Sequence, residues 1–298
     1  MFFGFLNKKN IKKSPLKTAS ADFLSLEKAS AENFVERFRE VVSDPLNLLI
    51  KRTPSAGYID KDNCIILHNG NRVPRDGPGA YYDNFSDLLI INRGVHEPLE
   101  EYCFQQMLEV LNNESPCMIE LGSYWAHYSM WLKKIKPTAQ CFMVESDEIN
   151  LFAGKENFKI NGMEGEFIKD FVGENAFSID QFFATRPIKK LDILHSDIQG
   201  YEYEMIKGAE RSLRERRIDY IFISTHSDEL HYQLENEIKA LGYRLEVSSN
   251  FSRDTTGYDG FILATNPIIK PLFKEWQSWG RIQINQSTPK AILKYLNQ

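Results

Sequence analysis

The hydrophobic positions of the chain alternate between two spacings from about residue 98 onward. Short apolar runs favour buried strands, and apolar residues that recur every three or four positions favour helices that pack on one face. The strands predicted in this way cover residues 118–122, 140–145, 166–169, 191–197 and 220–225. The predicted helices cover residues 98–111, 126–135, 148–160, 178–185, 201–216 and 229–241. Because strands and helices alternate, we expect a parallel sheet with helices on both faces.

Two further apolar runs, at residues 243–247 and 260–264, predict strands with no helix between them. The polar segment that joins them suits only a loop, so these two strands should pair in the antiparallel sense. The expected fold class is therefore α/β, with a doubly wound, mostly parallel, seven-stranded sheet that ends in an antiparallel hairpin.

The first 98 residues predict an N-terminal cap in front of this sheet. Residues 1–20 are basic and predict a mobile tail, and residues 21–51 carry apolar positions at helical spacing. The apolar run Cys64–His68 predicts a strand, and the run Leu88–Asn92 predicts a second strand that pairs with it. The expected domain organisation is a helical and β cap over residues 1–98, a core over 99–268 and a helical tail over 269–298.

The composition is that of a globular protein and excludes several classes of partner. The net charge of −5 lacks the excess of Lys and Arg that a nucleic-acid surface needs. No stretch approaches the roughly 20 apolar residues of a membrane span. The four cysteines show no CxxC spacing, which favours buried free thiols in a reducing compartment over a zinc site. We therefore predict a cytoplasmic protein without a membrane span or a nucleic-acid partner, and the sequence leaves a homo-oligomer open.

The segment Cys117–Ser129 carries the clearest chemical signal, because an apolar strand ends there on an acid and a glycine. Glu120 precedes Gly122 by two positions, and Glu145 ends the next predicted strand, 25 residues after Glu120. Both carboxylates should lie at the carboxyl edge of the sheet, where open α/β sheets bind ligands. Neither a GxGxxG pattern nor a P-loop is present, so the usual phosphate-binding loops are excluded.

A pair of carboxylates at this edge suits a ligand that has hydroxyls and an ammonium group but no phosphate. Glu145 can accept hydrogen bonds from both ribose hydroxyls of an adenosine compound, and Glu120 suits the ammonium of S-adenosylmethionine (SAM). Simpler interpretations stay open for both residues. Glu145 can complement the dipole of the following helix, and Glu120 can be a strand end that faces solvent.

From about residue 93 to residue 265 the chain resembles the FkbM-type SAM-dependent methyltransferases, a Class I, Rossmann-like family. The resemblance rests on the segments Arg93–Pro98, Ile119–Ser129, Val144–Ser146, Leu191–Glu202 and Lys207–Ala209. It implies a set of residues that surround the bound SAM, namely Glu120, Gly122, Ser123, Tyr124, Glu145, Ser146, Asp170 and Phe171. Two positions depart from the family pattern, because Ala126 replaces a glycine and Gln199 replaces a glutamate.

Methyl transfer to a hydroxyl requires a group that removes the hydroxyl proton. The resemblance implies that Asp197 faces the reaction centre, and His226 at the end of the fifth strand is the expected general base. His195 is a further catalytic candidate, although its deeper position also suits a buried hydrogen bond. The segment 195–197 is similar to the fourth-strand end of metal-dependent sugar O-methyltransferases. Asp197, His226 and Asp228 are therefore candidate ligands for Mg²⁺ or another divalent ion, and without one they would form a hydrogen-bonding site for a polyol.

The sequence as a whole predicts a SAM-dependent methyltransferase that acts on a small-molecule acceptor. The resemblance, rather than the residues themselves, favours O-methylation of a sugar, a sugar nucleotide or a secondary metabolite. Two alternatives stay open, which are N-methylation of a small amine or peptide, and an inactive SAM-binding scaffold. Asp197 and the neighbouring histidines argue against the scaffold, since a decayed site would not need them.

Overall fold

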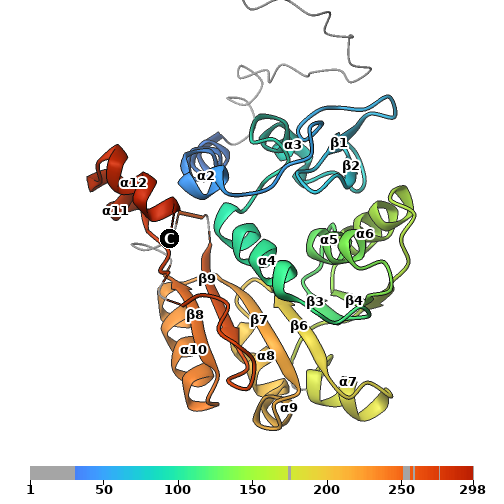
Figure 1. The fold of residues 1–298 in the computed structure, drawn as a ribbon. Coiled ribbons are helices and arrows are strands. Elements are labelled where there is room, and N and C mark those ends of the chain that lie inside the picture. The colour runs from blue at the N-terminus through green and yellow to red at the C-terminus, as the bar shows by residue number, and fades with distance from the viewer. Residues whose placement is uncertain (1–30, 174–175, 251–255, 258, 275, 298) are drawn as a thin grey trace, which may run out of the picture.

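The computed structural model describes residues 31–173, 176–250, 256–257, 259–274 and 276–297. Within this part, seven strands form one sheet in the order β5-β4-β3-β6-β7-β9-β8 (Figure 1). Their bounds are β3 (Cys117–Leu121), β4 (Gln140–Glu145), β5 (Glu166–Lys169), β6 (Leu191–Ser196), β7 (Ile218–Thr225), β8 (Arg244–Ser249) and β9 (Gly260–Thr265). The strands from β5 to β7 pair in parallel, and β9 is antiparallel to both β7 and β8. The predicted fold class is confirmed.

Two groups of helices cover the two faces of the sheet. Helices α4 (Pro98–Val110), α5 (His127–Ile135) and α6 (Glu148–Ile160) lie over one face, and α7 (Ile179–Thr185), α8 (Glu202–Gly208), α9 (Glu210–Arg214) and α10 (Asp228–Ala240) lie over the other. Successive β3 residues face opposite layers, because Met118 belongs to the first buried cluster and Ile119 to the second. The predicted helix 201–216 is two short helices, which meet at the non-helical Ala209.

The described N-terminal part consists of α2 (Ala31–Ser43), the 3-10 turn η1 (Pro45–Leu48), the hairpin of β1 (Cys64–Ile66) and β2 (Arg72–Pro74), and α3 (Tyr82–Ile91). The expected strand Leu88–Asn92 is wrong, since most of it belongs to α3 and β1 pairs with β2 instead. A short apolar run fits a buried helix as well as a strand, and only packing separates the two. The predicted mobile tail over residues 1–20 lies outside the described residues.

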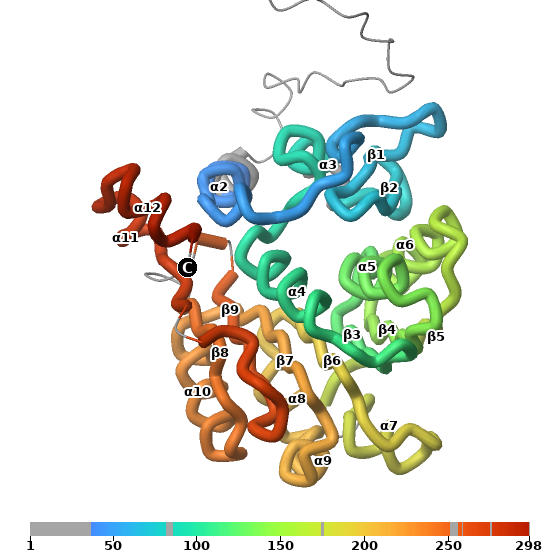
Figure 2. Tube along the Cα trace, viewed as in Figure 1, coloured from blue at the N-terminus to red at the C-terminus, as the bar shows by residue number. Residues whose placement is uncertain are grey.

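The end of the chain returns to this N-terminal part. Helices α11 (Arg281–Gln286) and α12 (Pro289–Leu296) lie beside α2 and η1 (Figure 2). Arg281 forms an ion pair with Glu40 of α2, and the buried Thr256 hydroxyl donates a hydrogen bond to Asp44. These contacts hold α2 in place, and α2 supplies Arg37 to the site described below.

Two predictions, one about the cysteines and one about membrane spans, can be compared with the described residues. Cys64, Cys103, Cys117 and Cys141 are all buried free thiols, as predicted. No described helix is both long enough and apolar enough to cross a membrane.

Candidate active site

Two cavities open side by side at the carboxyl edge of the parallel strands. Cavity A has a volume of about 400 Å³, and cavity B has a volume of about 260 Å³. The lining of both cavities includes Gly122, Tyr124, Asp197 and Gln199, which belong to the loops after β3 and β6. The two cavities therefore adjoin each other at these four residues.

Cavity A contains most of the residues expected to bind SAM. Its lining includes Gly122, Tyr124, Glu145, Ser146, Asp170 and Phe171 from the predicted set. The rings of Phe171 and Tyr201 meet edge to face with their centroids 4.5 Å apart, and each side chain is 45% exposed. Exposed aromatic rings at the mouth of a cavity give a flat heterocycle a surface against which to pack. Tyr201 was not singled out from the sequence.

Glu145 is held in place by backbone donors. Its carboxylate accepts hydrogen bonds from the amides of Tyr124, at 3.0 Å, and Asp147, at 2.9 Å. Burial raises the pKa of Glu145, although these amide hydrogen bonds act in the opposite direction. The carboxylate therefore anchors the loop after β3 and still lines cavity A.

Glu120 and Ser123 line cavity B instead of cavity A. The Glu120 carboxylate is buried and accepts hydrogen bonds from the amides of Tyr128, at 3.3 Å, and Ser129, at 3.0 Å, in the first turn of α5. Glu120 is thus not a solvent-facing strand end, and it satisfies amides that the helix leaves without internal partners.

The backbone around the shared wall adopts conformations that side chains usually avoid. Gly122 has a φ of +67°, and a Cβ placed on it would lie 1.7 Å from the Asp197 carbonyl oxygen. Ala126, which replaces the second family glycine, also has a positive φ of 60°. Tyr124 and Gln199 have positive φ values of 41° and 53°. Such strain collects at functional sites, where the surrounding contacts hold it in place.

Cavity B is lined by carboxylates and imidazoles. His226 is not itself a lining residue, but it contacts the lining residue Asp197, with Nε2 3.2 Å from Asp197 and Nδ1 2.9 Å from Glu202. Burial lowers the pKa of His226, but the carboxylates of Asp197 and Glu202 outweigh burial and raise it to about 10. The raised pKa favours the protonated form of His226 and so argues against the general-base role, which stays a prediction. The sequence missed Glu202 as its partner because the two residues lie on different elements.

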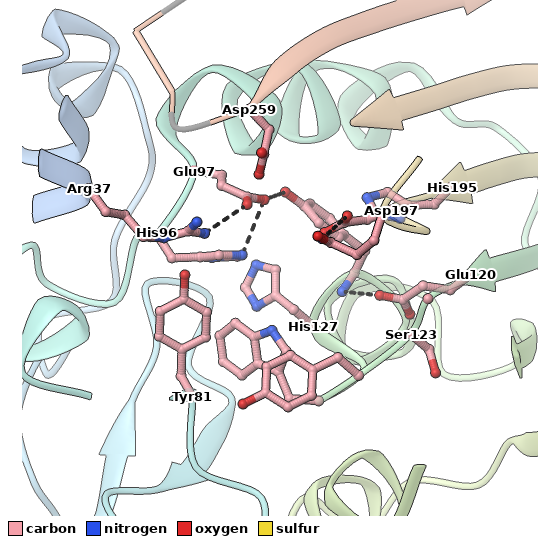
Figure 3. Close-up of a pocket in the computed structure, with 15 residues that line it drawn as sticks. Arg37, Tyr81, His96, Glu97, Glu120, Ser123, His127, His195, Asp197 and Asp259 are labelled. Carbon is pink, nitrogen blue, oxygen red and sulfur yellow. Dashed lines mark hydrogen bonds and ion pairs between the residues drawn. The ribbon is translucent and has the colours of Figure 1, made fainter. Parts of the chain in front are cut away.

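Asp259 is a lining residue of cavity B whose pKa is shifted toward neutral pH. Burial and the neighbouring Asp197 raise the pKa of Asp259 to about 7. Its carboxylate lies 3.9 Å from His226 Nε2, and Figure 3 shows it beside Glu97 on the wall of cavity B. Sequence analysis passed over Asp259, although it directly precedes β9. An antiparallel strand begins at the edge where its parallel neighbour ends, and that pattern could have identified it.

Other polar groups of cavity B form buried pairs. His195 Nε2 lies 2.5 Å from a Glu100 oxygen, and the second Glu100 oxygen accepts a hydrogen bond from Ser224. Burial lowers the pKa of His195, but Glu100 outweighs burial and raises it. Glu97 accepts hydrogen bonds from Arg37, at 3.2 Å, and from the Tyr128 hydroxyl, at 3.1 Å. His195 is thus held in a buried pair, the second of the two roles expected for it.

The expected divalent ion site is not formed. Asp197 and His226 meet, but Asp228 does not bring a carboxylate oxygen close enough to both of them for one ion to bind all three. Asp228 begins α10 directly after the N-cap Ser227, and His226 is already bound between carboxylates. Among the described residues, the group with metal-ligand spacing is a different one, formed by His68, Glu101 and His127.

Comparison with known proteins connects this geometry to a family. The model of the Methyltransferase FkbM domain matches residues 72–245, which is more than half of the chain. No curated protein matches the chain. Similar solved structures include the METTL16 methyltransferase domain, with 14% identity, 69% of this chain and 87% of that chain covered, and a TM-score of 0.45. They also include precorrin-6y C5,15-methyltransferase from Geobacter metallireducens GS-15, with 14% identity, 56% and 87% coverage, and a TM-score of 0.41.

A third similar structure is M. capricolum TrmK in complex with S-adenosyl-homocysteine, with 13% identity, 65% of this chain and 80% of that chain covered, and a TM-score of 0.40. The family match spans the strands from β3 to β7 and therefore most of the residues that line both cavities. The chain belongs to the FkbM family of methyltransferases and is a SAM-dependent methyltransferase.

Proposed function

We propose that cavity A binds SAM and cavity B binds the acceptor, and that the reaction is O-methylation of a sugar, a sugar nucleotide or a related secondary metabolite. The observation that carries this proposal is the wall shared by the two cavities, at Gly122, Tyr124, Asp197 and Gln199. Methyl transfer from a sulfonium is an in-line displacement, so donor and acceptor must meet across a short gap.

The contents of cavity A support SAM as its ligand. Glu145 offers carboxylate oxygens to the ribose hydroxyls, and the exposed rings of Phe171 and Tyr201 offer a surface to the adenine. The methionine end would then extend along Gly122 toward Asp197, where the two cavities meet. A ligand of this kind carries no phosphate, which fits the absence of a phosphate-binding loop from the sequence.

The lining of cavity B supports a hydroxyl acceptor. Carboxylates and imidazoles are partners for several hydroxyl groups at once, and the rings of Tyr81 and Trp125 lie 4.9 Å apart in the same wall. The small volume of about 260 Å³ favours one ring or one end of a larger acceptor inside the cavity.

The residues of cavity B supply the chemistry of the transfer. The acceptor oxygen forms a bond to the SAM methyl carbon while the sulfur–methyl bond breaks, which leaves S-adenosylhomocysteine. Asp259 takes the hydroxyl proton, since its pKa near 7 lets a carboxylate accept a proton at neutral pH. Asp197 contacts the acceptor, and His226 holds Asp197 in place as its charged partner. His195 acts as a positioning residue through its pair with Glu100.

Calorimetric titration with SAM and a mass-spectrometric acceptor screen test this proposal together. We expect SAM to bind, and we expect a mass increase of one methyl on a sugar or nucleotide-sugar acceptor. Small amines and peptides belong in the same screen, and methylation of a nitrogen would overturn the acceptor class. Tight SAM binding without a product from any acceptor would instead favour the inactive scaffold.

Replacing Glu145 by alanine should weaken SAM binding by about 10- to 100-fold. A hydrogen bond from a hydroxyl to a charged group is worth roughly 1.5–3 kcal/mol, so the net loss of one such bond already weakens binding by this factor. The measurement is the dissociation constant of SAM by calorimetry. The matched control is Asp147→Asn, which changes an exposed carboxyl two residues away that lies outside both cavities. Equal SAM affinity in Glu145→Ala and the control would contradict the ribose assignment.

We also propose that the protein works in the cytoplasm, because its buried cysteines are free thiols and a reducing compartment maintains that state. Fractionation of cells followed by detection of the chain tests this location. Recovery of the chain mainly outside the cytoplasmic fraction would contradict it.

A further inference from the structure

We propose that His68, Glu101 and His127 bind one divalent transition-metal ion of the Zn²⁺ type, at a site distinct from the methyl-transfer residues. One potential ligand atom from each residue lies within 4.8 Å of the other two. The three side chains belong to separate elements, since His68 follows β1, Glu101 lies in α4 and His127 begins α5. This histidine–glutamate cluster brings two of the six histidines of the sequence to one carboxylate.

The spacing of the cluster fits a shared ion. His68 Nε2 lies 3.0 Å from one Glu101 oxygen, and His127 Nε2 lies 3.7 Å from the other. Ligands that bind a zinc ion at about 2.0–2.2 Å lie roughly 3–4.3 Å from one another. The side chains therefore need only small rotations to receive an ion between them.

Unsatisfied nitrogens are an independent sign of a missing ligand. Neither ring nitrogen of His127 has a hydrogen-bond partner among the described residues, and the side chain is only 1% exposed. His68 Nδ1 also lacks a hydrogen-bond partner among the described residues, while His68 Nε2 faces a Glu101 oxygen at 3.0 Å, and both side chains are fully buried. Buried polar atoms are normally satisfied, so each exception requires an explanation. Coordination of an ion would satisfy one ring nitrogen of each histidine and the Glu101 oxygen.

The donor set selects the class of ion. Two imidazoles with one carboxylate suit zinc, iron, cobalt or nickel, whereas magnesium and calcium prefer oxygen ligands throughout. His96 Nδ1 lies 2.6 Å from a Glu101 oxygen, and the His96 amide donates a hydrogen bond of 2.9 Å to the same oxygen. His96 is therefore placed as an outer partner that orients the carboxylate, as is common around metal ligands.

The position of the cluster indicates a structural role beside cavity B. The His127 ring packs against the rings of His96 and Trp125, with centroids 4.6 Å and 4.9 Å away, and all three residues line cavity B. Figure 3 shows His127 beside His96 in this wall. His68 and Glu101 lie outside the lining of that cavity. An ion here would join the segment after β1 to α4 and α5, and so would fix the wall against which the acceptor packs.

Metal titration of the untagged chain tests this proposal. After removal of metal by a chelator, we expect one Zn²⁺ per chain in competition with a chromophoric chelator. Co²⁺ in place of Zn²⁺ should produce visible absorption bands. His127→Gln should abolish stoichiometric binding, and His96→Gln should weaken it by about 10- to 100-fold. The control is His231→Gln, which removes a buried histidine that is hydrogen-bonded to Thr225 and Ser248, and it should bind metal as the wild type does.

Two outcomes would overturn the proposed metal site. One is that the wild type binds no stoichiometric Zn²⁺, and the other is that a folded His127→Gln variant binds Zn²⁺ as the wild type does. If His127→Gln does not fold, X-ray absorption of the Zn²⁺-loaded wild type decides the matter. Nitrogen and oxygen ligands with imidazole scattering support the site, and sulfur ligands overturn it. SAM titration of the metal-free chain separates this result from the proposed function, because cavity A contains none of the three ligands.

Discussion

Replacing Asp259 by asparagine should lower kcat by about 10²- to 10⁴-fold and leave the affinity for SAM nearly unchanged. General-base catalysis contributes a factor of this size, and asparagine keeps the shape of the side chain but cannot take a proton. Asp259 lines cavity B and not cavity A, so the donor site should be unaffected. The measurements are steady-state kinetics on an acceptor from the screen and calorimetry with SAM.

The pH profile distinguishes a base from a residue that only shapes the cavity. The pKa of Asp259 is raised to about 7, so the active carboxylate form replaces the protonated form as the pH increases through that value. The kcat/KM of the wild type should therefore rise between about pH 6 and pH 8 and level off above that range. The small remaining activity of Asp259→Asn should lack this rise, while Asp147→Asn should keep the wild-type profile.

Retention of both kcat and the pH profile in Asp259→Asn would reject Asp259 as the base. In that case Asp197→Ala becomes the decisive variant, because Asp197 is the carboxylate that lines both cavities. His226 is a poorer candidate for the base than Asp259 or Asp197, since its pKa of about 10 favours the protonated form between about pH 6 and pH 8.

Gly122→Ala should abolish SAM binding. It should also destabilise the fold more than a glycine-to-alanine substitution at any other position near the site. The new Cβ would overlap the carbonyl oxygen of Asp197 at 1.7 Å, and the neighbouring carbonyl carbon would be 2.7 Å away. Both atoms belong to backbone, which cannot rotate away as a side chain can. The loops after β3 and β6 must then separate, and cavity A loses the wall that both loops form.

Gly162→Ala is the matched control for this variant. Gly162 has a similar φ of +63°, but a Cβ there would meet nothing within 4 Å. The control should cost only the left-handed backbone penalty of about 1–2 kcal/mol in the free energy of unfolding. Gly122→Ala should add an overpacking cost of about 1–3 kcal/mol or more. Denaturant unfolding and SAM calorimetry measure both effects, and equal values for the two variants would show that the close approach does not matter.

Local patterns in the sequence were sufficient to predict the sheet and the edge at which both cavities open. The bounds of β4, α6 and β5 agree with their predictions, because periodic apolar positions and caps such as Asp147 act over a few neighbouring residues. The ends of consecutive parallel strands meet at one edge, which is why Gly122, Glu145 and Asp197 could be placed together in advance. The family resemblance added the identity of the cofactor.

Interactions between distant segments decided the features that the sequence did not predict. Leu88–Asn92 lies mainly in α3, where Leu88 and Leu89 are buried in the same apolar cluster as Ile65, and the run itself does not reveal that packing. The charge of His226 depends on Glu202, and Asp259 reaches the cavity only through the antiparallel start of β9. The histidine–glutamate cluster likewise draws on three separate elements. The sequence alone therefore determined the fold class and the family, and predicted the edge at which both cavities open, through short-range periodicity and motif order. The tertiary structure alone decided which charges face one another, because burial and Coulomb interactions depend on distance in space.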